Sequence, residues 1–96
     1  MTANVLAAPG RYAFANLSSS GSTLLKTGIG SLGGVAIGTG AVGASITLYD
    51  GIDNTGKLIS VIGAAAPAGL TFGIQFFTGL YVVVAGGSPN AVVSYT

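Results

Sequence analysis

Three of the five charged side chains in this 96-residue chain lie in one short segment, residues 46–60 (ITLYDGIDNTGKLIS). They are Asp50, Asp53 and Lys57. Carboxylates so close in sequence are typical of a metal site or of a general acid and base. They are equally typical of a solvated turn between two buried strands, because a charge at a loop tip keeps its hydration.

The spacing of these residues favours the turn. A calcium loop places Asp or Asn at alternate positions, followed by a glycine and a later glutamate. Asp50, Asp53 and Asn54 do not have this spacing, and the chain contains no glutamate. An acid–base pair would need a pocket, which a tip of small polar residues does not provide. We therefore expect a hairpin turn here, with no metal site and no catalytic pair.

Other catalytic chemistry is poorly represented in the sequence. The chain has no histidine and no cysteine, so a serine nucleophile would lack its usual base and no thiolate is available. The glycine-rich residues 28–34 precede no predicted helix that could bind a phosphate at its N-terminus. The aromatic residues Phe76, Phe77 and Tyr81 are expected mainly in the core. The sequence thus predicts no enzyme, no catalytic residue and no cofactor.

The composition instead indicates a component of an assembly. Charged residues make up 5 % of the chain, whereas about 25 % is usual in soluble domains. Residues 58–96 carry no charge at all, so much of this surface is expected to be covered by other subunits. The basic residues Arg11, Lys26 and Lys57 are scattered and the net charge is +1, which argues against a nucleic acid as partner.

A membrane segment is not expected either. Residues 28–48 are uncharged and long enough to span a bilayer. They contain seven glycines, however, and each glycine disfavours a helix by about 1 kcal/mol relative to alanine. At the beginning of the sequence no basic region precedes an apolar core, so we also expect no signal peptide.

Short runs of β-branched and aromatic residues recur along the chain and end at Gly, Pro, Asn or Asp, which is typical of strands. No helical periodicity interrupts them. We expect an all-β fold, a small antiparallel β-sandwich or barrel of seven to eight strands. The expected strands are residues 11–17, 23–28, 32–38, 44–50, 57–63, 70–76, 79–87 and 91–96.

The chain divides into an extended N-terminal arm with its connector, residues 1–20, and a sandwich domain, residues 21–96. A turn signal at Pro9 and Gly10 and the flexible SSSGS connector mark this division. Within the sandwich, Gly34, Ala36 and Gly38 fall on one face of their strand. This bare face is suited to the close approach of another sheet or subunit.

Residues 23–96 resemble a group of small virion proteins of tailed bacteriophages. The motifs that carry this resemblance are LYDG (48–51), TGKLI (55–59), FFTGLYVVVAGG (76–87) and the closing strand VVSYT (92–96). The resemblance implies an all-β structural protein of the virion, of the capsid decoration (cement) type. Residues 1–22 match no part of this pattern.

On this resemblance the expected function is to bind the outer capsid surface and to bridge and stabilise capsomers. The expected partners are the major capsid protein and further copies of the chain, as a homotrimer or, alternatively, a dimer. Arg11, Tyr12 and Phe14 are the arm residues expected to bind the capsid, because aromatic side chains dominate small interfaces. A second interpretation is that Tyr12 and Phe14 complete the protein's own core.

The alternative function is a tail or fibre module that recognises the host cell surface. It would require an exposed aromatic groove, for which Tyr49, Phe77 and Tyr81 are the candidates. A cellular adhesin or fibre subunit is a third hypothesis, which the expected absence of a signal peptide disfavours.

Overall fold

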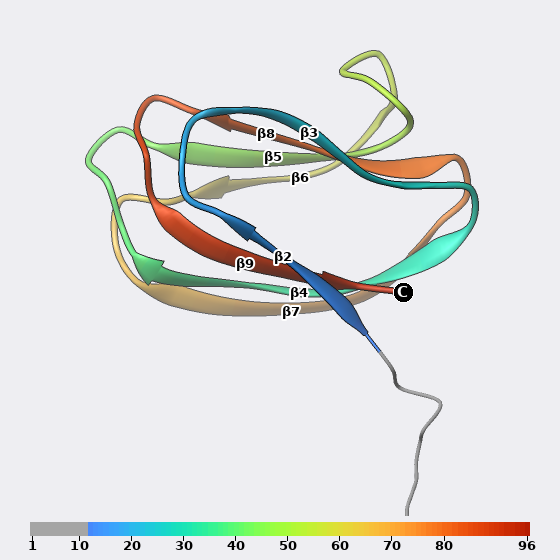
Figure 1. Ribbon diagram of the computed structural model, residues 1–96, viewed down its shortest axis with the longest axis horizontal. Coiled ribbons are helices and arrows are strands. Elements are labelled where there is room, and N and C mark those ends of the chain that lie inside the picture. Colours follow the sequence, from blue (N-terminus) through green and yellow to red (C-terminus); the bar gives the residue numbers. More distant parts are fainter. Residues whose placement is uncertain (1–11) are drawn as a thin grey trace, which may run out of the picture.

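The computed structural model describes residues 12–96 and confirms a small all-β sandwich. Two four-stranded antiparallel sheets, β2-β9-β4-β7 and β3-β8-β5-β6, pack face to face (Figure 1). Among residues 12–96, no helix is long and apolar enough to cross a membrane. The strands are β2 (Ala13–Leu17), β3 (Gly21–Thr27), β4 (Gly30–Thr39), β5 (Ser45–Asp50), β6 (Lys57–Gly63), β7 (Ala68–Phe76), β8 (Gly79–Ala85) and β9 (Asn90–Tyr95).

The strand pairings describe one long hairpin that is rolled up. β5 pairs with β6, β4 with β7, β3 with β8, and β2 with β9. Two further pairings, β4 with β9 and β5 with β8, close the roll into two sheets. This connectivity is that of an eight-stranded jelly roll. The charged segment of the sequence joins β5 to β6 and therefore lies at the tip of the rolled hairpin (Figure 1).

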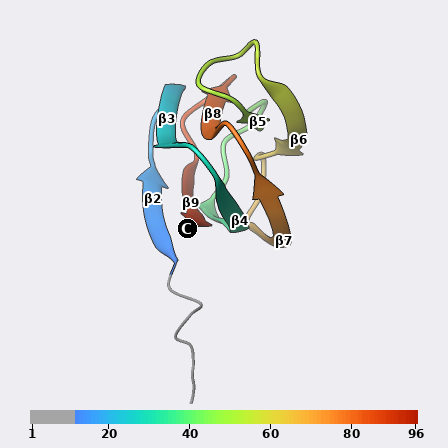
Figure 2. The same ribbon diagram turned by 90° about the vertical axis from the view of Figure 1, so that its right-hand side faces the viewer.

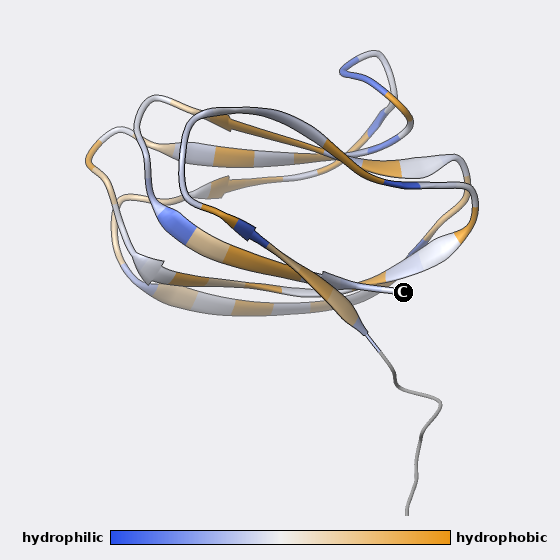
Figure 3. Cartoon of the chain, in the orientation of Figure 1, coloured by the Kyte–Doolittle hydropathy of each residue, from blue (hydrophilic) through white to orange (hydrophobic). Residues whose placement is uncertain are grey.

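The core lies between the sheets and follows the alternation of apolar residues along the strands. No polar or charged side chain is buried among the described residues. The strands accordingly alternate between hydrophobic and more hydrophilic positions in Figure 3. The largest fully buried apolar side chains are Phe76, Leu32, Ile46, Leu48, Leu80, Val35, Val82 and Val93.

A β-bulge in β4 explains why the sequence LGGV has apolar residues three positions apart. Leu32 and Val35 are both buried, which strict alternation does not allow. The register between β4 and β9 shifts between Leu32 and Gly34, so one extra residue is accommodated there. As a result, Gly33 and Gly34 both face away from the core.

The expected boundary at residue 20 does not coincide with the edge of the sheet. The described part of the expected arm is strand β2, which pairs with β9 from Ala13 opposite Tyr95 to Leu17 opposite Ala91. Leu17 belongs to the core cluster. The expected arm is therefore an integral edge strand from Ala13 onward, and residues 1–11 lie outside the described part of the chain.

The two sides of the sandwich differ in how well the interior is sealed. Figure 2 shows β2 and β3 along one side and β6 and β7 along the other. On the β2/β3 side, Leu17 is buried. On the β6/β7 side, which we call the open side, Leu70 and Ile74 are each 40 % exposed. They are paired with buried Val35 and Leu32 and thus point inward, because paired residues share a face.

Candidate binding surface

Tyr12 and Phe14 lie on the outside of the β2-β9-β4-β7 sheet. Phe14 is opposite Ser94 of β9, and its side chain is 72 % exposed. Tyr12 is 46 % exposed, and its ring lies against Gly33. A β-carbon added to Gly33 would be 2.9 Å from this ring. Neither aromatic residue belongs to the core cluster, so the interpretation that they complete the core is wrong.

The face beside these two rings is built from small, uncharged residues. In register across β2, β9, β4 and β7 lie Phe14, Ser94, Gly34 and Thr71, and in the next row Asn16, Val92, Ala36 and Gly69. We call these two rows, together with Tyr12 and Gly33, the small-residue face. It contains the outward-facing Gly34 and Ala36 that the sequence predicted. Because it has no charge and few large side chains beyond the β2 edge, another protein surface can approach its backbone closely.

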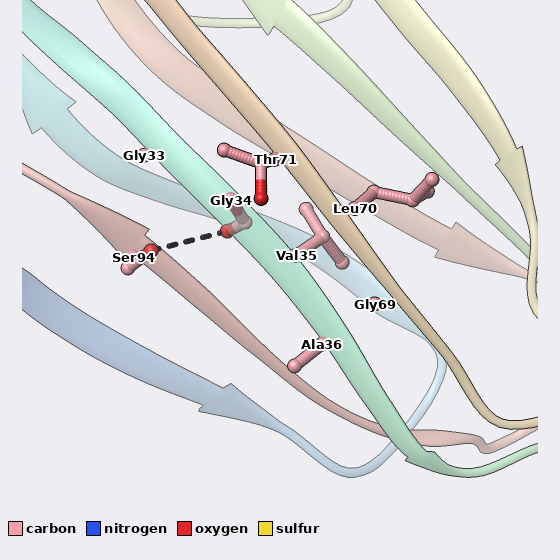
Figure 4. A pocket seen from close by; sticks show the side chains of 8 residues that line it. All are labelled: Gly33, Gly34, Val35, Ala36, Gly69, Leu70, Thr71 and Ser94. Atoms are coloured by element: carbon pink, nitrogen blue, oxygen red, sulfur yellow. Dashed lines mark hydrogen bonds between the residues drawn. The ribbon is translucent and has the colours of Figure 1, made fainter.

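The small-residue face is hollowed into a shallow groove of about 450 Å³ (Figure 4). Its lining comes from β4, β7 and β9 and consists of Gly33, Gly34, Val35, Ala36, Gly69, Leu70, Thr71 and Ser94. The Ser94 hydroxyl donates a long hydrogen bond of 3.4 Å to the Gly34 carbonyl. The Thr71 hydroxyl is the second polar side-chain group in the lining. The groove thus offers hydroxyl and backbone groups on an otherwise apolar surface.

Residue Asp50 has a structural role at the end of β5. Its carboxylate accepts hydrogen bonds from the backbone N–H groups of Phe77 (3.0 Å), Thr78 (2.8 Å) and Gly79 (3.3 Å). Desolvation alone would raise the pKa of Asp50, but the N–H groups and nearby Lys57 together hold it below its ordinary value of 3.8. Asp50 therefore holds the β7–β8 turn against the end of β5.

Asp53 also serves its own loop. It accepts hydrogen bonds from the backbone N–H and the hydroxyl of Thr55, and these bonds lower the pKa of Asp53. Asp50 and Asp53 thus bind different turns of the backbone. Within residues 12–96, no group of three or more His, Cys, Asp or Glu side chains could hold a metal ion.

The outer face of the other sheet has large apolar side chains. In register across β3, β8, β5 and β6 lie Leu24, Tyr81, Tyr49 and Leu58, followed by Ser22, Val83, Thr47 and Val61. We call these two rows the tyrosine face. The ring centroids of Tyr49 and Tyr81 are 6.3 Å apart with a tilt of 50°. Tyr81 is only partly buried, so its expected place in the core is not what the structure shows.

Phe77 is likewise not a core residue, whereas its neighbour Phe76 is fully buried. Phe77 is 65 % exposed in the turn between β7 and β8. It lines a pocket of about 300 Å³ together with Asp50, Lys57, Leu58, Ile59, Ile74 and Gln75. Sequence reasoning missed the charged groups near this ring, because Asp50 and Lys57 reach it from β5 and β6.

Comparisons of the chain with models of known protein families, with curated proteins and with solved structures found no match.

Proposed function

We propose that this protein is a structural protein of a tailed-bacteriophage virion that binds the outer surface of the capsid. It would bridge and stabilise neighbouring capsomers through contacts with the major capsid protein. The proposal starts from the resemblance of residues 23–96 to small phage virion proteins. The jelly-roll fold is compatible with this function, but the same fold hosts many unrelated functions. The proposal therefore depends on the chemistry of the protein surface.

The observation that carries the proposal is the small-residue face with two exposed aromatic rings at its edge. Phe14 presents most of its ring to solvent and Tyr12 nearly half. In protein interfaces, buried aromatic anchors contribute most of the binding energy, surrounded by contacts that exclude water. The groove over Gly33 and Gly34 is a surface into which a loop or strand of a capsid protein fits without having to displace any charge.

The two aromatic rings at the edge of this face lie at the start of the described residues, next to strand β2 or within it. Tyr12 directly follows Arg11, which lies outside the described residues and which we expect to pair with a capsid carboxylate. Attachment would then combine one peripheral ion pair with the aromatic anchors and the groove.

Co-sedimentation with capsids tests the proposal. Particles of the encoding virus that were produced without this protein are mixed with the purified wild type and pelleted. We expect saturable binding that Phe14→Ala weakens about tenfold or more, as for an aromatic anchor. Val42→Ala is the matched control, since Val42 is 93 % exposed and does not belong to this face. Wild-type protein that stays in the supernatant would refute the proposal.

A second candidate function, recognition of the host surface by a tail or fibre, is favoured by a different observation. Exposed Phe77 lies beside Asp50, Lys57 and Gln75 in one pocket, and an aromatic ring among polar side chains suits a sugar or peptide. Binding of the isolated protein to host cells, abolished by Phe77→Ala and unaffected by Phe14→Ala, would support this candidate over capsid decoration.

A further inference from the structure

The open side leaves the interior of the sandwich incompletely covered. Leu70 and Ile74 point inward from β7 and still expose two fifths of their surface. Leu58 of the edge strand β6 is exposed as well and lines one pocket together with Ile74. Apolar side chains on two adjacent edges form a contiguous apolar surface, which is uncommon on a monomer.

The edge strands themselves have only part of the usual protection against pairing, namely one register irregularity in each strand. Natural edge strands are commonly protected by charges, proline or bulges. In β6 and β7 the only charged residue is Lys57, at the first position of β6, and neither strand contains proline. Gly73, with φ of 64°, interrupts β7 near its end. The stretch Ala68–Phe72 remains as a regular edge with unpaired backbone groups.

We propose that the open side binds the open side of a second copy, related by a twofold axis. The area is sufficient: β7 is about 30 Å long, and an edge two sheets thick buries roughly 500 Å² per copy, or roughly 1,000 Å² in total. This meets the lower limit of about 1,000 Å² for a stable interface. Such a contact adds β7 of one copy to β7 of the other and covers Leu70 and Ile74.

The distribution of charge agrees with this arrangement. Asp50 and Lys57 lie together at one end of the open side. Among residues 12–96, no charged residue lies at the opposite end, near Gly63 and Ala68. An antiparallel pair of β7 strands places the charged end of each copy against the uncharged end of its partner. Like charges of the described residues therefore do not meet across the twofold contact, in which each patch faces its own copy.

This inference rests on the proposed role only in taking the protein to be oligomeric, and it selects a dimer over the trimer. The test is sedimentation equilibrium of the wild type and of Leu70→Lys/Ile74→Lys, which places two ammonium groups on the open side. We expect a reversible dimer of the wild type and a dissociation constant at least about tenfold higher for the variant. Val42→Lys is the control and should remain dimeric.

A wild type that is monomeric at about 100 μM, above the micromolar range of a contact this small, would overturn the inference. A trimer, or a variant with unchanged association, would overturn it as well. If the variant does not fold, hydrogen exchange of the wild type decides. Amides of residues 68–72 must then be more protected in concentrated than in dilute protein. Deletion of residues 1–11 is a further check. If it abolishes the dimer, the inference is refuted, and the arm rather than β7 makes the contact between copies.

The two proposals fail independently. If the wild type is a dimer that Leu70→Lys/Ile74→Lys dissociates, but the wild type does not bind particles, this inference is supported and capsid decoration is refuted. If the wild type is a monomer that binds particles, capsid decoration is supported and the dimer is refuted.

Discussion

The outer faces of the two sheets are built by the same alternation of residues and yet differ in what they leave for a partner. On the tyrosine face, Tyr49 and Tyr81 contact each other across β5 and β8, and Leu24 and Leu58 continue the row on either side. Large side chains there cover their own backbone. On the small-residue face, the corresponding positions hold Ser94 and Gly34, and a groove remains. The comparison shows that large side chains fill the tyrosine face, whereas the small-residue face leaves its backbone open to close approach.

The largest expected effect comes from a substitution in the core, which lies between the two sheets. Phe76 is fully buried, and its ring lies against Gly30. We expect Phe76→Ala to lower the free energy of unfolding by about 3–5 kcal/mol, because it leaves a large cavity. Urea denaturation measures this loss. An effect below about 1 kcal/mol would show that the described core does not hold the two sheets together.

A substitution within the groove should damage only one face. A β-carbon at Gly34 would lie 2.6 Å from the Leu70 carbonyl oxygen, so Gly34→Val forces β4 and β7 apart. We expect a loss of about 1–3 kcal/mol in the free energy of unfolding, as for other overpacked sites, together with loss of capsid binding. The same change at Gly63, where the space for a β-carbon is open, is the control. If Gly34→Val binds like the wild type, the groove is not the binding surface.

Truncation of one aromatic residue on each face should separate binding from stability. We expect Phe14→Ala to weaken binding by about tenfold or more, with little change in stability, because its ring is mostly exposed. Tyr81→Ala should instead reduce the free energy of unfolding by about 1–2 kcal/mol, since it removes the contact with Tyr49, and should leave binding intact. Thermal denaturation and co-sedimentation of both variants measure the two quantities. The reverse pattern would exchange the roles of the faces.

The smallest expected effect concerns Asp50, which joins the end of β5 to the turn that connects the two sheets between β7 and β8. Asp50→Asn should cost about 1 kcal/mol at neutral pH, because a charged acceptor of several N–H bonds is lost at a partly exposed site. The folded-state pKa of Asp50 lies below 3.8, so its contribution is complete above that value and is lost as the pH falls through the lower folded-state pKa. The wild type and the variant should therefore become equally stable in strong acid.

Urea denaturation of both proteins between neutral and acidic pH checks this dependence. Asp53→Asn is the matched control and should have the smaller effect, since Asp53 binds only Thr55 within its own loop. A difference between wild type and Asp50→Asn that persists in strong acid would contradict the assigned role.

The alternation of side chains made much of the fold predictable from the sequence. In LTFGIQF, Leu70, Phe72, Ile74 and Phe76 share one face, as predicted, since period-two patterning fixes the face without knowledge of the partner strand. The sequence could not specify the rows across strands. Ser94 and Gly34 are 60 positions apart and meet only because of the β4–β9 register, which includes a bulge.

The sites were predicted less well, and for the same physical reason. The sequence identified the segment around Asp50 as a turn but not the residues that the carboxylate binds, which are 27 to 29 positions away. It placed Phe77 in the core with Phe76, although strand β7 ends at Phe76 and Phe77 lies in the following turn. It assigned residues 13–17 to an arm, because nothing local indicates that β9 pairs with them.

Immunogold electron microscopy of particles from a lysate of the virus or organism that encodes this protein tests the central claim most directly. An antibody against the protein is applied to intact, purified particles. Capsid decoration predicts gold distributed over the whole shell. Gold confined to the tail, or particles without gold, would contradict it.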